Sequence, residues 1–75
     1  MTFEIFKAFP PDREGPVAEL NVRHDGLVDI PAEIRREEGK LRIAIFAQRS
    51  GVAWDYPLDE FLVAVQEAVE VLGDE

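Results

Sequence analysis

The sequence predicts an α+β fold, in which a small, mostly antiparallel sheet carries one C-terminal helix packed on one face. Three observations predict it: apolar residues that alternate near the N-terminus, an Asp-Gly turn signal, and a helical apolar stripe near the C-terminus. At 75 residues the chain has the length of one domain, spanning 1–75. So small a core leaves little room for a deep substrate cavity, so we do not expect an enzyme.

The N-terminal part predicts two strands. Residues 2–9 and residues 18–23 alternate between apolar and polar side chains, as strands with one wet face do. Between them, residues 10–16 contain three prolines and one glycine. This composition predicts a loop.

The Asp25-Gly26 pair predicts a hairpin after the second strand. A two-residue loop would pair Val22 with Asp29. A three-residue loop, residues 24–26, pairs Val22 with Val28 and Leu20 with Ile30. We favour the three-residue loop because it keeps the apolar residues on one face. Gly26 then takes the left-handed conformation.

A short helix is predicted over residues 31–38. Pro31 suits the first position of a helix, and Gly39 suits its end. The following segment, 41–47, is apolar on both faces toward its end, which predicts a central strand.

A second hairpin is predicted around the turn at residues 48–51. Val52, Trp54 and Tyr56 alternate with more polar positions, as a strand does. A four-residue loop would place Trp54 opposite Ile45 and Tyr56 opposite Ile43.

The last element is a long helix that begins at Pro57 and ends at Gly73. Its apolar positions recur at helical spacing and form one stripe. The members of this stripe are Leu58, Phe61, Leu62, Val65, Val69 and Leu72.

The charge of the chain is strongly negative and unevenly placed. Sixteen acids against eight bases give −8. Residues 50–75 hold seven of the acids and no Lys or Arg, so almost the whole imbalance lies there. A surface of this sign repels nucleic acids and anionic membranes and suits a basic partner. We therefore expect no direct nucleic-acid or membrane binding.

The acidic side of the C-terminal helix is the candidate partner-binding site. No Lys four residues away offsets these acids, although such pairs are usual on exposed helices. The alternative is a solvated face that only aids solubility. The candidate residues are Asp59, Glu60, Glu67, Glu70 and Asp74.

A second candidate is an apolar patch formed by Phe6 and Phe46. Both alternate away from the face that carries the helix, so they point to the opposite side of the sheet. An uncovered patch there would be a partner or dimer surface. The alternative is that the short helix and the 10–16 loop cover it.

No residue set predicts catalysis, a metal site or a cofactor. The chain has no cysteine, and its one histidine, His24, lies in the predicted tight turn, away from any pocket. No glycine-rich phosphate loop or metal-ligand spacing occurs. The N-terminus has no secretion signal and no apolar run is long enough to span a bilayer, so the expected location is the cytoplasm.

Residues 27–35, Leu-Val-Asp-Ile-Pro-Ala-Glu-Ile-Arg, resemble the strand and Ile-Pro-x-Glu-Ile-Arg stretch of the swapped-hairpin (AbrB-like) antitoxin and transcription-factor family. That family binds DNA. The acidity of this chain argues against carrying the DNA contacts over, and Glu38-Gly39-Lys40 replaces the family's usual Gly-Asp turn.

In size, acidity and lack of catalytic residues, the chain is similar to small phage-encoded inhibitors such as anti-CRISPR proteins, and to bacterial immunity proteins. This resemblance implies a nucleic-acid mimic that inhibits a nucleic-acid-processing complex, such as a CRISPR effector, by occupying its basic surface. The alternatives are an immunity protein or antitoxin that neutralises a basic toxin, and a homodimeric structural subunit. The expected state is a monomer or a homodimer.

Overall fold

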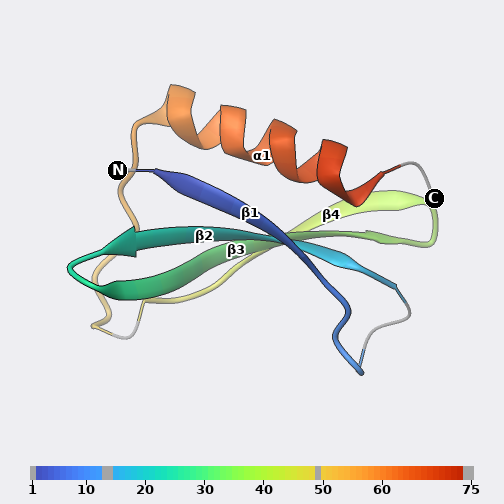
Figure 1. Ribbon diagram of the computed structural model, residues 1–75, viewed down its shortest axis with the longest axis horizontal. Helices are drawn as coiled ribbons and strands as arrows, with labels where there is room; N and C mark the ends of the chain where they lie inside the picture. Colours follow the sequence, from blue (N-terminus) through green and yellow to red (C-terminus); the bar gives the residue numbers. More distant parts are fainter. Residues whose placement is uncertain (1, 13–14, 49, 74–75) are drawn as a thin grey trace.

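The computed structural model describes residues 2–12, 15–48 and 50–73, and shows a two-layer α+β arrangement (Figure 1). One layer is a four-stranded antiparallel sheet with strand order β1-β2-β3-β4, and the other is a single C-terminal helix. The elements are β1 (Phe3–Ala8), β2 (Val17–His24), β3 (Leu27–Glu37), β4 (Lys40–Ile45) and α1 (Leu58–Leu72).

The hairpin between β2 and β3 has a two-residue turn. His24 pairs with Leu27, and both Asp25 (φ 50°) and Gly26 (φ 75°) are left-handed, as in a type I′ turn. The predicted left-handed conformation of Gly26 is confirmed. The predicted three-residue loop is wrong, because Val22 lies opposite Asp29. The I′ turn matches the twist of the two strands, which favours the shorter loop.

A β-bulge restores the apolar register farther along this hairpin. The pairing shifts by one residue between Leu20 and Val22, so that Leu20 lies opposite Ala32 instead of Pro31, its partner in an unshifted register. The predicted pairing of Leu20 with Ile30 is wrong. The extra residue is on β3, next to Pro31. A proline lacks the N–H that a regular ladder needs, so a bulge is one of the few places where a strand accepts it.

The predicted short helix over residues 31–38 is wrong, because this segment is the second half of β3. Residues 32–37 pair with β4 on one side, and residues 32–35 pair with β2 on the other. Ile34 is only 3% exposed between these neighbours. A two-turn helix here would bury only one large side chain. The strand instead forms hydrogen bonds with both neighbouring strands and contributes to the core, and this stabilisation outweighs local helix propensity. Gly39 (φ 77°) lies in the β3–β4 turn instead of ending a helix.

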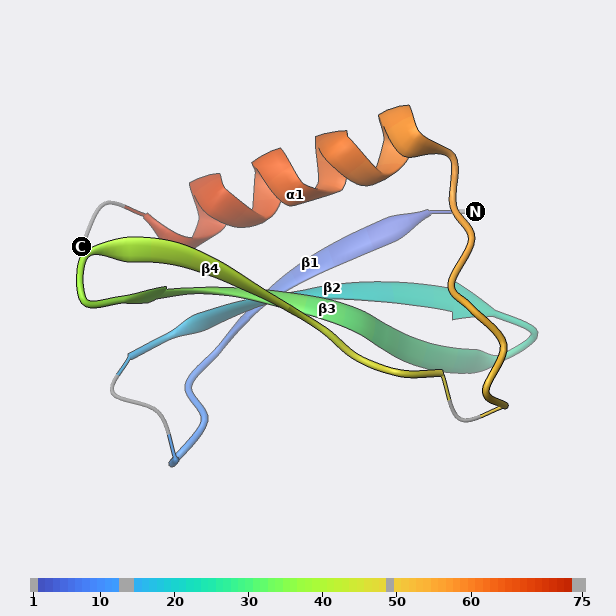
Figure 2. The ribbon, with the colours of Figure 1, turned by 180° about the vertical axis from the view of Figure 1, so that it is seen from behind.

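The strand over residues 41–47 is shorter than predicted and lies at an edge of the sheet. β4 ends at Ile45, and no strand forms over residues 52–56, so the predicted second hairpin and central position are wrong. Residues 46–48 and 50–57 lie across the end of the sheet, and the second of these segments leads into α1 (Figure 2). Trp54 donates from Nε1 to the carbonyl oxygen of Phe46 at 2.7 Å, which holds this crossing segment.

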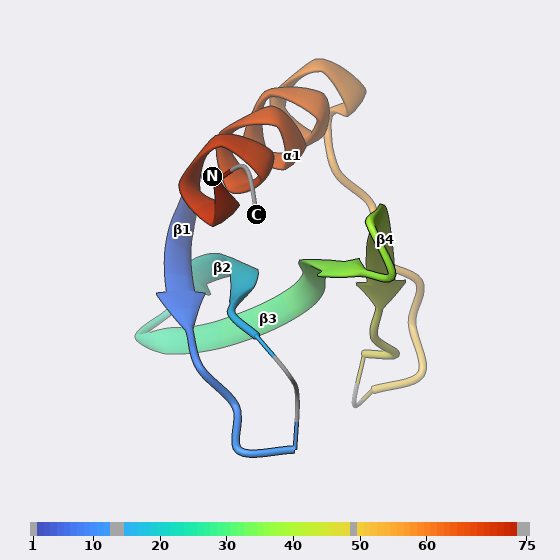
Figure 3. The same cartoon turned by 90° about the vertical axis from the view of Figure 1, so that its right-hand side faces the viewer.

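Helix α1 begins after Pro57 and ends before Gly73, as predicted. It packs against β1, β2 and β3, whereas no Cα atom of α1 lies within 8 Å of a Cα atom of β4 (Figure 3). Its buried residues are Ala64, Ala68 and Leu72, whereas Leu58 and Leu62 of the predicted stripe are 70% and 56% exposed. Small alanines at the centre allow the helix to approach the sheet closely. The buried sheet residues below it are Ala18, Leu20, Ala32 and Ile34.

Candidate partner-binding surface

Helix α1 presents a row of exposed carboxylates, which we call the acidic α1 surface. Asp59, Glu60, Glu67 and Glu70 belong to it, and each is exposed. Asp74, the fifth residue predicted for this surface, lies outside the described residues. The row exists because the helix buries its alanine side against the sheet and leaves the other positions to solvent.

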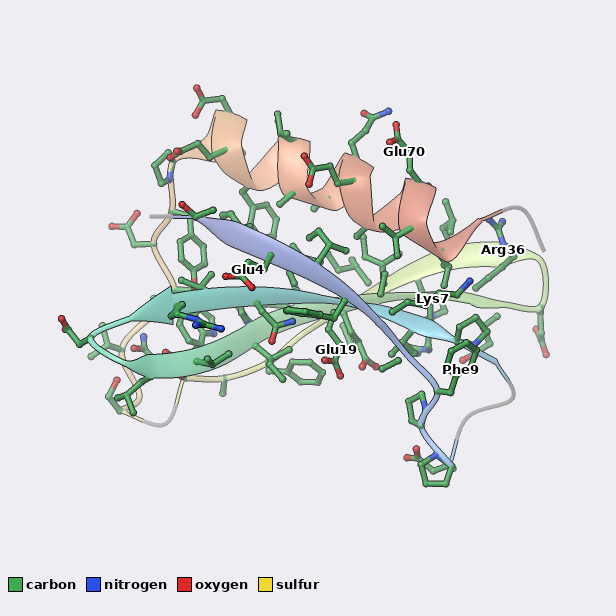
Figure 4. The ribbon with its side chains drawn as sticks, in the orientation of Figure 1. Glu4, Lys7, Phe9, Glu19, Arg36 and Glu70 are labelled. Atoms are coloured by element: carbon green, nitrogen blue, oxygen red, sulfur yellow. The ribbon has the colours of Figure 1, made fainter. Side chains whose placement is uncertain are left out.

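The four carboxylates divide between two sides of the helix. Asp59, Glu60 and Glu67 line a shallow hollow of about 380 Å³ at the start of β1, where Thr2 and Phe3 form the other wall. Glu70 points outward, away from the sheet (Figure 4). Glu60 and Glu67 are about 10.5 Å apart along the helix axis, from a rise of about 1.5 Å per residue.

The bases of the described chain lie on or beside the sheet, and none lies on α1. Ion pairs form within the sheet, among them Arg23 with Glu4 at 4.0 Å and Arg35 with Glu37 at 3.2 Å. Within residues 2–12, 15–48 and 50–73, no ion pair reaches the acidic α1 surface. The molecule therefore has a mixed-charge layer and a purely acidic one.

The C-terminal end of α1 receives a positive charge from another element. Arg36 of β3 donates from Nη2 to the carbonyl oxygen of Gly73 at 3.0 Å. A cation at this end is favourable because the unpaired carbonyls of a helix carry partial negative charge. Local sequence patterns do not predict this contact, and the one signal for it is the lack of any base in the last turn of the helix.

An aromatic cluster lies under the first turns of α1. The ring of Phe3 meets Tyr56 and Phe61 edge-on, with centroids 5.1 and 5.9 Å apart. Tyr56 stacks between Trp54 and Phe61 at 5.8 and 6.1 Å. Trp54 and Tyr56, which were predicted to lie in a strand, instead pack against the start of the helix.

The phenol of Tyr56 is held in its neutral form by this cluster. Its oxygen is shielded from solvent and has no hydrogen-bond partner among the described residues. Burial, and then the negative charge of Asp29, raise the pKa of Tyr56 above its usual value of 10.0. The folded protein therefore binds the phenol proton more tightly than the unfolded chain does.

We expect stability to fall above about pH 10, and Tyr56→Phe to remove part of that fall. Between the unfolded and the folded pKa the native state holds the extra proton, so the free energy of unfolding decreases as pH rises through this interval. Urea unfolding of the wild type and of Tyr56→Phe at pH 7 to 11 measures this pH dependence. Tyrosinate absorbance follows the ionisation of Tyr56 alone, because the chain has one Tyr. Equal pH slopes for the two proteins would contradict the assignment.

The sheet face opposite α1 carries the two phenylalanines of the second candidate. Phe6 and Phe46 are 48% and 40% exposed, and no short helix covers them. They lie at opposite edges of the sheet, however, because Phe6 is on β1 and Phe46 follows β4. The line across the sheet from Phe6 passes through Glu19 and Glu33. The structure therefore does not bring the two rings together.

The described part of the chain holds no candidate metal centre. No three His, Cys, Asp or Glu side chains among these residues are placed to hold a metal ion. None of the described helices is both long and apolar enough to cross a membrane.

Comparison with protein-family models, with curated proteins and with solved structures finds no match to this chain.

Proposed function

We propose that this protein is a non-enzymatic binding protein whose acidic α1 surface engages a basic surface of a protein that handles nucleic acid, and so inhibits it. One observation carries the proposal: four exposed carboxylates lie on one helix, and no base of the described chain pairs with them. Asp59 and Glu60 lie in the first turn of α1, where negative charge stabilises a helix. Glu67 and Glu70 have neither that role nor a compensating base, so a role in binding accounts for them better.

The expected mode is mimicry of a nucleic-acid backbone. A groove that binds phosphates is lined with Lys and Arg, and a row of carboxylates on a rigid helix is complementary to it. A CRISPR effector complex is the target class that the size and acidity of the chain favour. Because the charges are exposed, they act mainly by accelerating association, and binding should weaken with salt.

Reversing two charges on the β1 side of the helix, Glu60→Lys with Glu67→Lys, is expected to weaken partner binding at least tenfold. The matched control is Asp12→Lys with Glu38→Lys, which makes the same change in net charge at exposed positions on the other layer. Tagged versions of both variants and the wild type are used in pull-downs from bacterial lysate. The salt is about 0.05 and about 0.3 M, where the screening length falls from roughly 14 to roughly 6 Å.

The proposal is supported if the wild type and the control recover the same nucleic-acid-binding complex, less at high salt, and the Glu60/Glu67 variant does not. Quantitative mass spectrometry identifies the recovered proteins. Equal recovery by all three proteins would show that the acidic α1 surface is not the binding site. Recovery of one small basic toxin instead would identify an immunity protein.

A further inference from the structure

Strand β1 is an edge of the sheet, and within the described residues it pairs with β2 alone. In an antiparallel sheet, alternate residues of an edge strand direct their N–H and C=O groups away from the neighbouring strand. His24 and Leu27 flank the two-residue turn and therefore form a hydrogen-bonded pair. Counting in steps of two from this pair assigns the open side of β1 to Phe3, Ile5 and Lys7. This edge can therefore form hydrogen bonds with one added strand.

Helix α1 lies above this edge. It sits over β1 and β2 more than over β3 (Figure 3). Thr2 and Phe3 form one wall of the shallow hollow of about 380 Å³, and the flank of the helix, with Val63 and Ala64, forms the other. A strand added to β1 would run along this hollow and turn alternate side chains toward the helix. An open strand edge with a helix above it is a layout that suits binding of an extended peptide by strand addition.

The helix wall of the hollow has an acidic, an apolar and a second acidic position in order. Glu60 and Glu67 are exposed, and Val63 between them is 58% exposed. The two carboxylates are about 10.5 Å apart along the helix axis. Side chains on one face of a strand recur about every 6.8 Å, so a base, an apolar residue and a base at alternate positions span about 13.6 Å. Long Lys and Arg side chains can bend to cover the difference of roughly 3 Å.

The charge of this flank favours a basic segment over a second copy of the chain. A two-fold axis that paired two β1 edges would place the α1 flanks side by side and bring Glu60 and Glu67 of one copy toward those of the other. Like charges that meet at an interface oppose association. The same charges repel a nucleic acid. The other open edge, β4, lies farther from α1 and lines no part of this hollow.

We propose that the β1 edge and the α1 flank above it bind an extended segment of the partner as a fifth strand, and that this segment has a base, an apolar residue and a base at alternate positions. This inference rests on the proposed function and specifies the conformation of the bound partner. The apolar residue lies opposite Phe3 and the second base lies opposite Ile5. A base opposite Lys7 would meet a like charge, which disfavours the alternative register.

Fluorescence anisotropy with a labelled synthetic peptide tests the charge pattern. The probe is acetylated and amidated Thr-Lys-Thr-Val-Thr-Lys-Thr. The control peptide, Thr-Lys-Val-Thr-Lys-Thr-Thr, has the same composition but puts its bases on opposite faces of a strand, and we expect it to bind at least fivefold more weakly. Glu60→Lys with Glu67→Lys should weaken binding of the probe at least tenfold at about 0.05 M salt, whereas Asp12→Lys with Glu38→Lys should change it less than twofold. Circular dichroism verifies that both variants fold.

Backbone methylation of the probe tests strand addition without changing its charge. Methylating one alternate set of amide nitrogens removes the donors that face β1, so binding is expected to weaken at least tenfold. Methylating the other set, which faces solvent, should change binding less than threefold. In NMR spectra of the ¹⁵N-labelled protein, the amide signals of Phe3 and Ile5 should shift on binding. The amide signal of Ile43, on the other open edge, should not.

Failure of strand addition and failure of the proposed function give different results. Equal binding by the probe and both methylated peptides would overturn strand addition, even if charge reversal at Glu60 and Glu67 still weakened binding. A probe that does not bind at millimolar concentration, or that shifts Ile43 instead of Phe3 and Ile5, would overturn it as well. Unchanged binding of the probe to the Glu60/Glu67 variant would overturn the charge pattern. The pull-down from lysate tests the proposed function separately, because it requires no particular conformation of the partner.

Discussion

Replacing Leu20 with alanine is expected to lower the free energy of unfolding by about 3–5 kcal/mol, the upper range for buried Leu→Ala changes. Leu20 is fully buried at the centre of the sheet, on β2, where it belongs to the cluster under α1. The neighbours cannot collapse into the space, because strands on both sides fix their positions. A domain of this length has a total stability of roughly 4–11 kcal/mol, so the variant should lose a large share of it.

Leu27→Ala is the matched control for this prediction. It removes the same atoms from a side chain that is 65% exposed at the β2–β3 turn, so the expected loss is within about 0.5 kcal/mol. Urea unfolding followed by circular dichroism and by the fluorescence of the single Trp gives both values. Similar losses for the two variants would show that Leu20 is not at the centre of the core.

Ala68→Gln is expected to cost about 3 kcal/mol or more, whereas Leu62→Gln should cost less than about 1 kcal/mol. Ala68 is fully buried between the helix and the sheet, so Gln at this position overpacks the contact and buries an amide without partners. Leu62 is 56% exposed. The helical pattern alone ranks these positions in the reverse order, because Leu62 belongs to its apolar stripe and Ala68 does not.

Thermal and urea unfolding of both Gln variants measures the difference. Neither substitution changes the net charge, so electrostatics cannot account for the result. A larger loss for Leu62→Gln would mean that α1 is rotated relative to the arrangement described above.

Local signals in the sequence were sufficient for several elements. The limits of α1 followed from Pro57 and Gly73, since one suits a helix start and the other a helix end. The first two strands followed from alternation. The sequence signals failed where pairing partners decide the structure. Residues 31–38 resemble a short helix locally, yet residues 31–37 form a strand between β2 and β4 because both neighbours hydrogen-bond to it.

The exposure of the acids on α1 could also be predicted, because a 3.6-residue period separates them from the positions that face the sheet. The exposure of Ile43 and Ile45 on β4 could not be predicted. It depends on where α1 lies across the four strands. Helical periodicity predicts which residues of the helix face inward, but it does not predict which strands lie beneath them. The contact of Arg36 with Gly73 likewise joins positions 37 residues apart in sequence.

By itself, the sequence determined the α+β class, the boundaries of the helix and the concentration of negative charge in its last third, because these depend on neighbouring residues and on composition. Only the tertiary structure decided that β4 is an edge strand, that Ala64 and Ala68 form the contact with the sheet, and that Leu62 and Ile45 stay exposed. The physical reason is that these features depend on the position of one layer over the other. That position is set by close packing of small side chains, which no local pattern encodes.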